Sequence, residues 1–277
     1  MLLMLRLLAT TLLLSSFVHA SPTVEKIENF LQEQFSENQR LEKVTVKVDS
    51  IKKLKELSAW SAYIVDVKAT LKADPKNIIR QKMIWFSNGK MITKELTDLV
   101  SGENMSEIVK PDFKNEYYRD ENLIYGNKNA KHKVAIFSDP LCPFCRGFVP
   151  GAIEDMKKEP KKFAIYYYHF PLPRIHPASV ELVKAAVAAE QQGYKDVVLK
   201  LYNVTINPAE KDIHKILKAF NKAVGTHITP ADLSKPSVVK AIQFDFNVAN
   251  NVMVGGTPTL YLDGKIDKTK KKYLKIK

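Results

Sequence analysis

The sequence predicts a two-part protein, with a small α+β domain followed by a larger α/β domain that carries a helical insertion. Residues 133–170 read as strand, helix and strand, which is the pattern of a β-α-β unit with parallel strands. From Ala178, about seventy residues have mainly helical spacing before a strand-like segment returns at Gly255. A separate α+β pattern over residues 21–102 precedes both, so two domains are expected.

The first domain is predicted to pair one helix with three strands. Residues 24–35 have the spacing of an amphipathic helix. The expected strands are 44–48, 62–67 and 78–87. After the last strand, Asn88-Gly89 predicts a hairpin turn, because both residues tolerate positive φ. The domain contains no cysteine or histidine, so its expected role is assembly or the holding of substrate.

Polar and charged residues dominate between the domains, and residues 103–121 are predicted to be a linker. The second domain is predicted over residues 122–277, with its helical insertion at about 177–250. Its strands are expected at 133–137, 162–170 and 255–262, the last entered through Pro258, and helices of the insertion at 178–192, 197–202, 213–224 and 238–249. Tyr166, Tyr167 and Tyr168 are expected to place their rings alternately inside and outside.

Cys142 and Cys145 are the only cysteines of the chain and form a C-x-x-C pair. They follow the apolar strand and precede residues of helical spacing, so they lie where a strand leads into a helix. Unpaired N–H groups and the helix dipole favour a thiolate there, and Pro143 suits the first helical turn. We therefore expect Cys142 to be an exposed nucleophile with a lowered pKa, and Cys145 to be the resolving thiol.

Two other uses of the cysteine pair compete with redox chemistry. A zinc site would need two further ligands, and the six histidines are scattered along the chain. A structural disulfide across so short a loop would add little stability. No metal or separate cofactor is expected, because the redox group would be the Cys142–Cys145 disulfide itself.

The first twenty residues predict export. Residues 1–20 contain an apolar core followed by Val18-His19-Ala20, which fits a cleavable signal peptide. A membrane anchor is the alternative, but the uncharged run from Leu7 to Val18 is shorter than the ~20 residues of a membrane span. Loss of Arg6 with this leader lowers the formal charge from +13 to +12. The lysines are spread along the chain without a nucleic-acid motif, so a solvated basic surface and no nucleic-acid partner are expected.

Three segments carry a family resemblance: Ser138-Asp139-Pro140-Leu141-Cys142-Pro143-Phe144-Cys145, Gly256-Thr257-Pro258-Thr259, and His169-Phe170-Pro171-Leu172 with His176-Pro177. They resemble the active-site turn, the cis-proline loop and the start of the helical insertion in exported Dsb-type thiol:disulfide oxidoreductases. These proteins have a thioredoxin fold. The α+β domain ahead of a linker is similar to the DsbC/DsbG branch, where such a domain forms a dimer.

The resemblance implies an enzyme that exchanges disulfides in other proteins. It implies catalytic roles for Cys142 and Cys145, and substrate contacts for Pro143, Phe144, Thr257 and Pro258. It also implies cysteine-containing exported proteins as substrates, a membrane redox partner that resets the active site, and a homodimer in the periplasm. Isomerase or reductase chemistry is expected. A DsbA-like oxidase, a reductant in cytochrome c maturation and a non-catalytic chaperone are the alternatives.

The chain differs from the family in two respects, and three polar residues near the motifs could have catalytic roles. Thioredoxin and DsbA have a buried acidic residue six positions before the nucleophile, whereas this chain has Ile136. The absence of an acid at this position resembles DsbC and DsbG. Few residues follow Gly264, so the closing strand and helix are expected to be short. Asp139 is expected to cap the turn, and His169 and His176 are expected to be structural.

Overall fold

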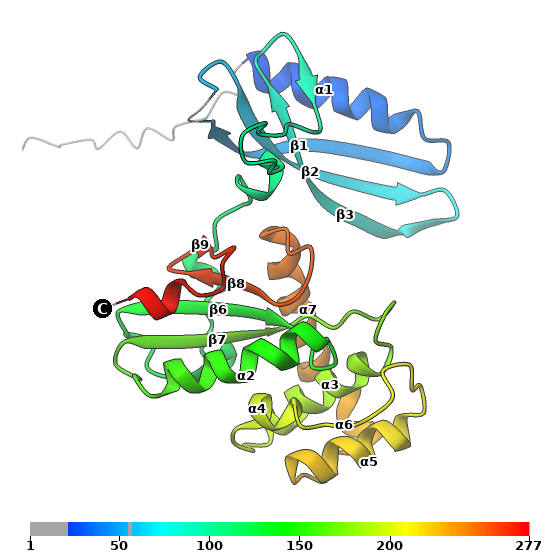
Figure 1. The fold of residues 1–277 in the computed structure, drawn as a ribbon. Helices are drawn as coiled ribbons and strands as arrows, with labels where there is room; N and C mark the ends of the chain where they lie inside the picture. Colours follow the sequence, from blue (N-terminus) through cyan, green and yellow to red (C-terminus); the bar gives the residue numbers. More distant parts are fainter. Residues whose placement is uncertain (1–21, 55–56, 277) are drawn as a thin grey trace, which may run out of the picture. The chain divides into compact units, whose positions relative to one another are not determined.

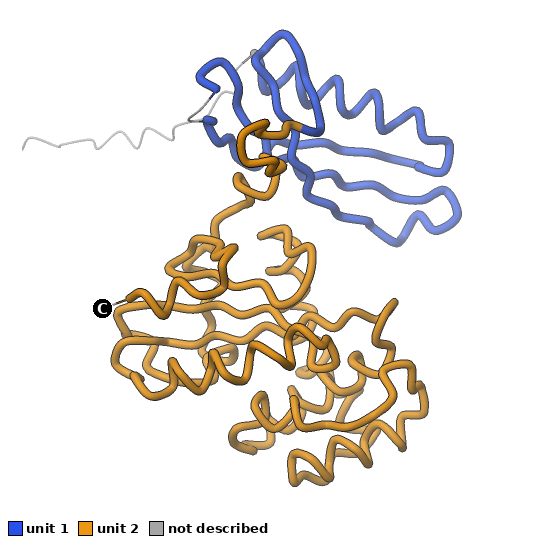
Figure 2. The backbone as a smooth tube through the Cα atoms, in the orientation of Figure 1, with its two compact units in different colours: residues 1–95 blue, residues 96–277 orange. Residues whose placement is uncertain are grey.

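The computed structural model describes residues 22–54 and 57–276. The predicted signal peptide, residues 1–20, lies outside the described residues. The chain divides into two compact units, the first ending at Glu95 and the second beginning at Leu96 (Figure 2). The division therefore comes earlier than residue 102, where the sequence placed the end of the first domain.

Unit 1 is a four-stranded antiparallel sheet with one helix packed on it (Figure 1). Its elements are α1 (Pro22–Ser36), β1 (Leu41–Lys53), β2 (Ser61–Leu71), β3 (Asp74–Ser87) and β4 (Ile92–Thr93), and the strands are adjacent in that order. Ile27 and Leu31 of the helix pack against Val46 and Val65 of the sheet. This burial of one helical face against one sheet face is what the amphipathic pattern predicts.

The turn after β3 differs from the predicted hairpin in one respect. Of the Asn88-Gly89 pair, only Gly89 has a positive φ, at 84°. The side-chain oxygen of Asn88 instead accepts hydrogen bonds from the N–H groups of Lys90 and Met91, at 3.0 and 2.8 Å. The asparagine therefore closes a longer loop through its side chain, and only the glycine needs left-handed backbone.

Unit 2 contains a five-stranded mixed sheet in the order β5-β7-β6-β8-β9. Its strands are β5 (Leu123–Tyr125), β6 (His132–Ser138), β7 (Phe163–His169), β8 (Thr259–Leu262) and β9 (Lys265–Ile266). Strands β6 and β7 are parallel and are joined through helix α2 (Pro143–Lys157), so the predicted β-α-β unit is confirmed. Asp263 and Gly264 both have positive φ, 49° and 79°, and form the predicted turn between β8 and β9.

Both faces of this sheet are covered. Helix α2 packs on one face, and helix α7 (Pro236–Asn251) packs on the other together with Phe113 and Tyr117. The ring of Tyr167 therefore lies in the α2-side core, while those of Tyr166 and Tyr168 lie in the α7-side core. The rings alternate between the two faces of the sheet, as predicted. The prediction that one set lies outside was wrong, because a second layer covers that face and all three tyrosines of β7 are buried.

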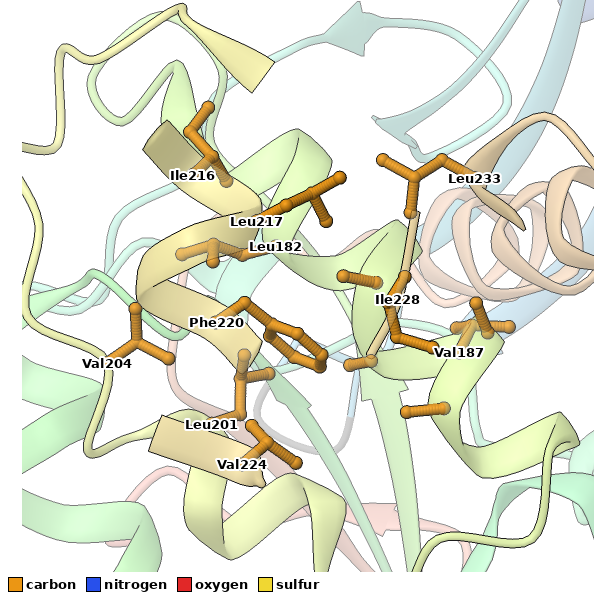
Figure 3. Packing of buried hydrophobic residues seen from close by; sticks show 14 of the residues in the cluster. Leu182, Val187, Leu201, Val204, Ile216, Leu217, Phe220, Val224, Ile228 and Leu233 are labelled. Carbon is orange, nitrogen blue, oxygen red and sulfur yellow. The ribbon is translucent and has the colours of Figure 1, made fainter. Parts of the chain in front are cut away.

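The helical insertion lies between β7 and β8 and has an apolar core of its own (Figure 3). Its helices are α3 (Ala178–Gln191), α4 (Val197–Leu201), α5 (Ile213–Val224), the four-residue α6 (Pro230–Leu233) and α7. Phe220 is fully buried at this core, and Leu141 of the active-site turn belongs to the same apolar cluster. The insertion is thereby packed against the turn that carries the cysteines.

Residues 103–121 form part of unit 2 and are not the predicted linker. They make three short 3₁₀ turns, Met105–Glu107, Asn115–Tyr117 and Asp120–Asn122. Phe113 is 3% exposed and contacts the rings of Phe137, Tyr168 and Tyr261. Its N–H donates to the carbonyl of Gly264 at 2.8 Å. The polar composition concealed this role, because a few apolar side chains bury the segment while its other residues face solvent.

The chain closes unit 2 with little regular structure, as expected. Beyond β9, Lys272–Lys275 form a 3₁₀ turn, and Tyr273 packs into the α2-side core. No helix within residues 22–54 and 57–276 has both the length and the apolar character needed to cross a membrane.

Candidate functional site

The two cysteines lie at the start of α2, each as a free thiol. Cys142 is the N-cap, with φ −67° and ψ 123°, and Pro143 is the first residue of the helix. The proline has no N–H to leave unpaired, so it begins the helix at no cost in hydrogen bonds. Cys142 is therefore placed at the positive end of the helix dipole, and Cys145 lies one turn further along.

The loop before β8 lies against the Cys142 sulfur. The Cys142 thiol donates to the carbonyl oxygen of Thr257 at 3.7 Å, and the Thr257–Pro258 peptide bond is cis. Two segments that are 115 residues apart in sequence thus meet at the reactive sulfur. Pro143 and Phe144 lie between the cysteines on the surface, with Phe144 78% exposed.

Cys142 is less accessible than the sequence predicted. The residue is 5% exposed, because the Thr257 carbonyl covers the sulfur and the side chain joins the α2-side core. Pro143 and Phe144 are the exposed residues that follow the sulfur directly in sequence.

Cys145 is fully buried, and this burial raises the pKa of its thiol to about 11. The Ser138 side chain and the Asp139 backbone act in the opposite direction and lower the pKa. The charge of Cys142 also contributes to raising the pKa of Cys145. At neutral pH Cys145 is accordingly a protonated thiol, which suits a group that acts second.

Asp139 anchors the turn that precedes Cys142. Its carboxylate is buried and accepts from the N–H of Leu141 at 2.8 Å and from the N–H of Leu172 at 2.7 Å. The same carboxylate is 3.1 Å from Nδ1 of His176. The expected capping role of Asp139 is confirmed, and His176 is its structural partner. These contacts tie the active-site turn to the start of the insertion.

Arg146 is a positioning residue that the sequence reading missed. Its Nε donates to the carbonyl of Pro140 at 2.8 Å, and its Nη2 donates to the carbonyl of Val204. The guanidinium therefore bridges the active-site turn and the segment after α4. An arginine one residue after a C-x-x-C pair gives no local signal of this role, because both acceptors are backbone carbonyls.

A chain of buried hydroxyl groups lies beneath Cys145. The Ser138 and Tyr202 hydroxyls are 2.6 Å apart, and those of Tyr202 and Tyr167 are 2.8 Å apart. Burial holds the pKa of both tyrosines well above its usual range, so they stay neutral. Sequence reasoning missed this chain because Tyr202 comes from the insertion, far along the sequence from the cysteines.

His169 pairs with Ser138 in the sheet, and its polar contacts are with residues of the insertion, which suits the expected structural role. It is buried at the end of β7, its N–H donates to Asp245 at 2.8 Å, and its Nε2 is 3.9 Å from a Glu190 oxygen. It lines a cavity of about 680 Å³ together with Glu190 and Asp245. Among the side chains that the structure describes, no three His, Cys, Asp or Glu residues form a metal-binding group.

With this geometry in place, the family can be assigned. The family model described as Thioredoxin matches residues 119–277, more than half of the chain. The chain belongs to the thioredoxin family. The fold predicted from the active-site turn and the proline loop is thereby confirmed, and the family match includes Cys142, Cys145 and Pro258.

Curated relatives of this thioredoxin-family chain include the Na(+)/H(+) antiporter NhaA 1 of Mycolicibacterium gilvum (strain PYR-GCK) and that of Mycobacterium sp. (strain KMS). Each is 25% identical over 144 residues, which is 51% of this chain and 23% of the relative. The chain thus spans about a quarter of the length of these relatives.

Similar solved structures include oxidised BdbD from Bacillus subtilis, with 18% identity, a TM-score of 0.47 and coverage of 61% of this chain and 98% of that one. ScsC from Proteus mirabilis in a transitional conformation has 21% identity, a TM-score of 0.44 and coverage of 55% and 67%. The thiol-disulfide exchange protein alpha-DsbA2 from Wolbachia pipientis has 19% identity, a TM-score of 0.45 and coverage of 58% and 84%.

Proposed function

We propose that this chain is an exported thiol:disulfide oxidoreductase that acts on cysteine-containing proteins, as a disulfide isomerase or reductase. The observation that carries the proposal is the pairing of two free thiols at a helix start with a proline loop against the outer sulfur. No other arrangement among the described residues combines a nucleophile with a resolving group. Antiporter activity is not part of the proposal, because the matched region is a small share of those relatives.

The reaction follows from the different settings of the two thiols. The Cys142 thiolate attacks a substrate disulfide, forms a mixed disulfide and releases one substrate thiolate. In isomerisation, another substrate thiol then displaces Cys142, and the site is regenerated. In reduction, Cys145 attacks the Cys142 sulfur, so the Cys142–Cys145 disulfide forms and the second substrate sulfur leaves as a thiol. The enzyme is then oxidised by two electrons, and a membrane redox partner is proposed to return them.

The substrate is proposed to bind along the surface that borders Cys142. Phe144 offers an exposed ring beside the sulfur, and the loop at Thr257 and Pro258 offers backbone to an extended segment. The export of the protein rests on the leader-like residues 1–20. Proteins that carry disulfides are found in such oxidising compartments, so location and chemistry agree.

An oxidase is the second candidate, because the α3–α7 insertion follows β7 as in the DsbA-like resemblance. The same two cysteines would then accept electrons from substrate thiols. The reduction potential of the Cys142–Cys145 pair, measured against glutathione, separates the two directions. A potential below that of glutathione supports the reductase, and recovery of activity in ribonuclease carrying scrambled disulfides supports the isomerase. A strongly oxidising potential with no isomerisation would leave the oxidase.

A further inference from the structure

We infer that the hydroxyls of Ser138, Tyr202 and Tyr167 form a donor chain that stabilises the Cys145 thiolate during resolution of the mixed disulfide. The inference rests on the proposed function and assigns positioning residues to it. Among the described residues, Cys145 has no acidic side chain as a hydrogen-bond partner that could take up its proton. Cys145 must lose its proton to attack, yet it is fully buried and the position of a buried acid holds Ile136, which is itself fully buried.

The hydroxyls of Ser138, Tyr202 and Tyr167 lie where they can stabilise a thiolate on Cys145. Ser138 is the last residue of β6; its side chain lowers the pKa of Cys145, and its hydroxyl lies 2.6 Å from the Tyr202 hydroxyl. Tyr202 in turn contacts the Tyr167 hydroxyl at 2.8 Å. Cys145, Tyr167 and Tyr202 belong to one buried apolar cluster, so water does not compete for these hydrogen bonds.

Such a chain can point all its protons toward the sulfur. Tyr167 then donates to Tyr202, Tyr202 donates to Ser138, and Ser138 donates to the thiolate. Each hydroxyl both donates and accepts, and aligned hydrogen bonds in a buried setting strengthen one another. Burial keeps both tyrosines neutral, so the chain supplies hydrogen bonds without adding a negative charge beside the sulfur.

The other polar and titratable groups around Cys145 do not take this role. A charged Cys142 would repel a second thiolate, and the buried Thr257 hydroxyl has no hydrogen-bond partner in the described part of the chain that could pass a proton on. The Asp139 backbone also lowers the pKa of Cys145, but an N–H group does not extend into a chain of hydroxyls. The Asp139 carboxylate is engaged by the N–H groups of Leu141 and Leu172 and by His176. Only the Ser138 contact leads into a connected set of donors among the described residues.

The resolving step is balanced without a further reactant. The Cys145 thiolate forms a bond to the Cys142 sulfur, and the bond between Cys142 and the substrate sulfur breaks. The departing sulfur takes the electron pair and finally the proton that Cys145 released. The hydroxyl chain lowers the cost of the intermediate thiolate and is itself unchanged at the end.

The test measures the Cys145 thiolate directly, in the full chain carrying Cys142→Ser, from the pH dependence of thiolate absorbance. We expect Tyr202→Phe and Ser138→Ala to raise the measured pKa of Cys145 by about one pH unit. Below that pKa, the thiolate would be about tenfold scarcer, so resolution of a preformed mixed disulfide should slow about tenfold in the same variants with Cys142 restored. Ser138→Thr keeps the hydroxyl and should restore both values.

Tyr168→Phe is the matched control. Tyr168 is on the same strand as Tyr167 and donates its buried hydroxyl to the Tyr117 carbonyl at 2.6 Å, on the opposite face of the sheet. Loss of the Tyr168 hydroxyl should destabilise the protein about as much as loss of the Tyr202 hydroxyl, and it should leave the pKa of Cys145 unchanged. Equal Cys145 titrations in Tyr202→Phe, Ser138→Ala and Tyr168→Phe would overturn the inference. The titration needs no substrate, so its result does not depend on the proposed function. Failure of the proposed function would instead appear as an absence of disulfide exchange with protein substrates.

Discussion

At the scale of single residues, the site depends on buried polar groups that satisfy one another. Asp139 holds the turn before Cys142, and Arg146 ties that turn to the insertion through two backbone carbonyls. Removing one partner of such a set leaves buried donors or acceptors unpaired, which costs about 1–3 kcal/mol each. Asp139 could be predicted as a turn cap from its place before a proline. Arg146 could not, because its acceptors are fixed only by the folded backbone.

Asp245 gives a pH-dependent prediction at this scale. Burial raises the pKa of Asp245 to about 7, from a usual value of 3.8. Between these values the native protein keeps a proton that the unfolded chain has released. The free energy of unfolding should therefore fall as the pH rises from about 4 to about 7, by at most about 1.4 kcal/mol per pH unit from this residue. Below pH 4, the contribution is constant.

Urea unfolding of the full chain and of Asp245→Asn, measured at intervals between pH 4.5 and pH 7.5, checks this prediction. The stability of the wild-type protein relative to the variant should decline across the range, since the amide side chain of the variant cannot titrate. Parallel stability curves for the two proteins would show that Asp245 keeps an ordinary pKa.

At the scale of elements, regular segments were predicted well and irregular ones poorly. The predicted limits of 213–224 for α5 agree with the structure, because its apolar periodicity is strong and Gly225 follows it. The strand predicted at 255–262 ends as expected but begins only at Thr259, after Pro258, which cannot donate to a strand neighbour. The segment 103–121 was misread because its packing depends on single side chains such as Phe113, which leave no periodic pattern. The meeting of Thr257 with Cys142 was expected only from the family resemblance, since no local property of the sequence encodes it.

The revised role of residues 103–121 can be tested with two fragments. Residues 96–277 retain Phe113 and Tyr117, while residues 122–277 lack them and expose the aromatic rings that they cover. Loss of a buried aromatic side chain costs about 3–5 kcal/mol, so the shorter fragment should be less stable by at least that amount or fail to fold. Thermal unfolding and near-ultraviolet circular dichroism would report this. Equal unfolding temperatures would restore the linker prediction.

At the scale of the whole molecule, unit 1 carries no cysteine and unit 2 carries both, so chemistry and assembly are proposed to be divided between them. Within the described residues, most of β3 has no strand partner on one side, since β4 pairs with it only through Thr93 and Ile92. Ile78 and Ile79 of β3 are 53% and 41% exposed. An exposed strand edge with apolar residues favours pairing with another chain, which supports the proposed homodimer.

The dimer prediction concerns the full mature chain, residues 21–277. Light scattering should give about twice the chain mass for this protein and the monomer mass for residues 96–277, because the contact is assigned to unit 1. An Ile79→Lys variant should weaken the dimer by placing a charge on the exposed strand, and Lys76→Glu, an exposed charge change on the same strand, serves as the control. A monomeric full-length protein would remove the homodimer and favour the oxidase.

The most direct test of the central claim is covalent trapping of a substrate on Cys142. Cys145→Ser should attack a disulfide-bonded peptide and stop at a stable mixed disulfide, because the resolving thiol is absent and Cys142 remains at the helix start. Mass spectrometry of the unreduced protein should show one peptide per chain, attached at Cys142 and released by dithiothreitol. Cys142→Ser should trap none, since Cys145 is buried and protonated. Trapping on Cys145, or equal trapping by both variants, would contradict the assignment of Cys142 as the nucleophile.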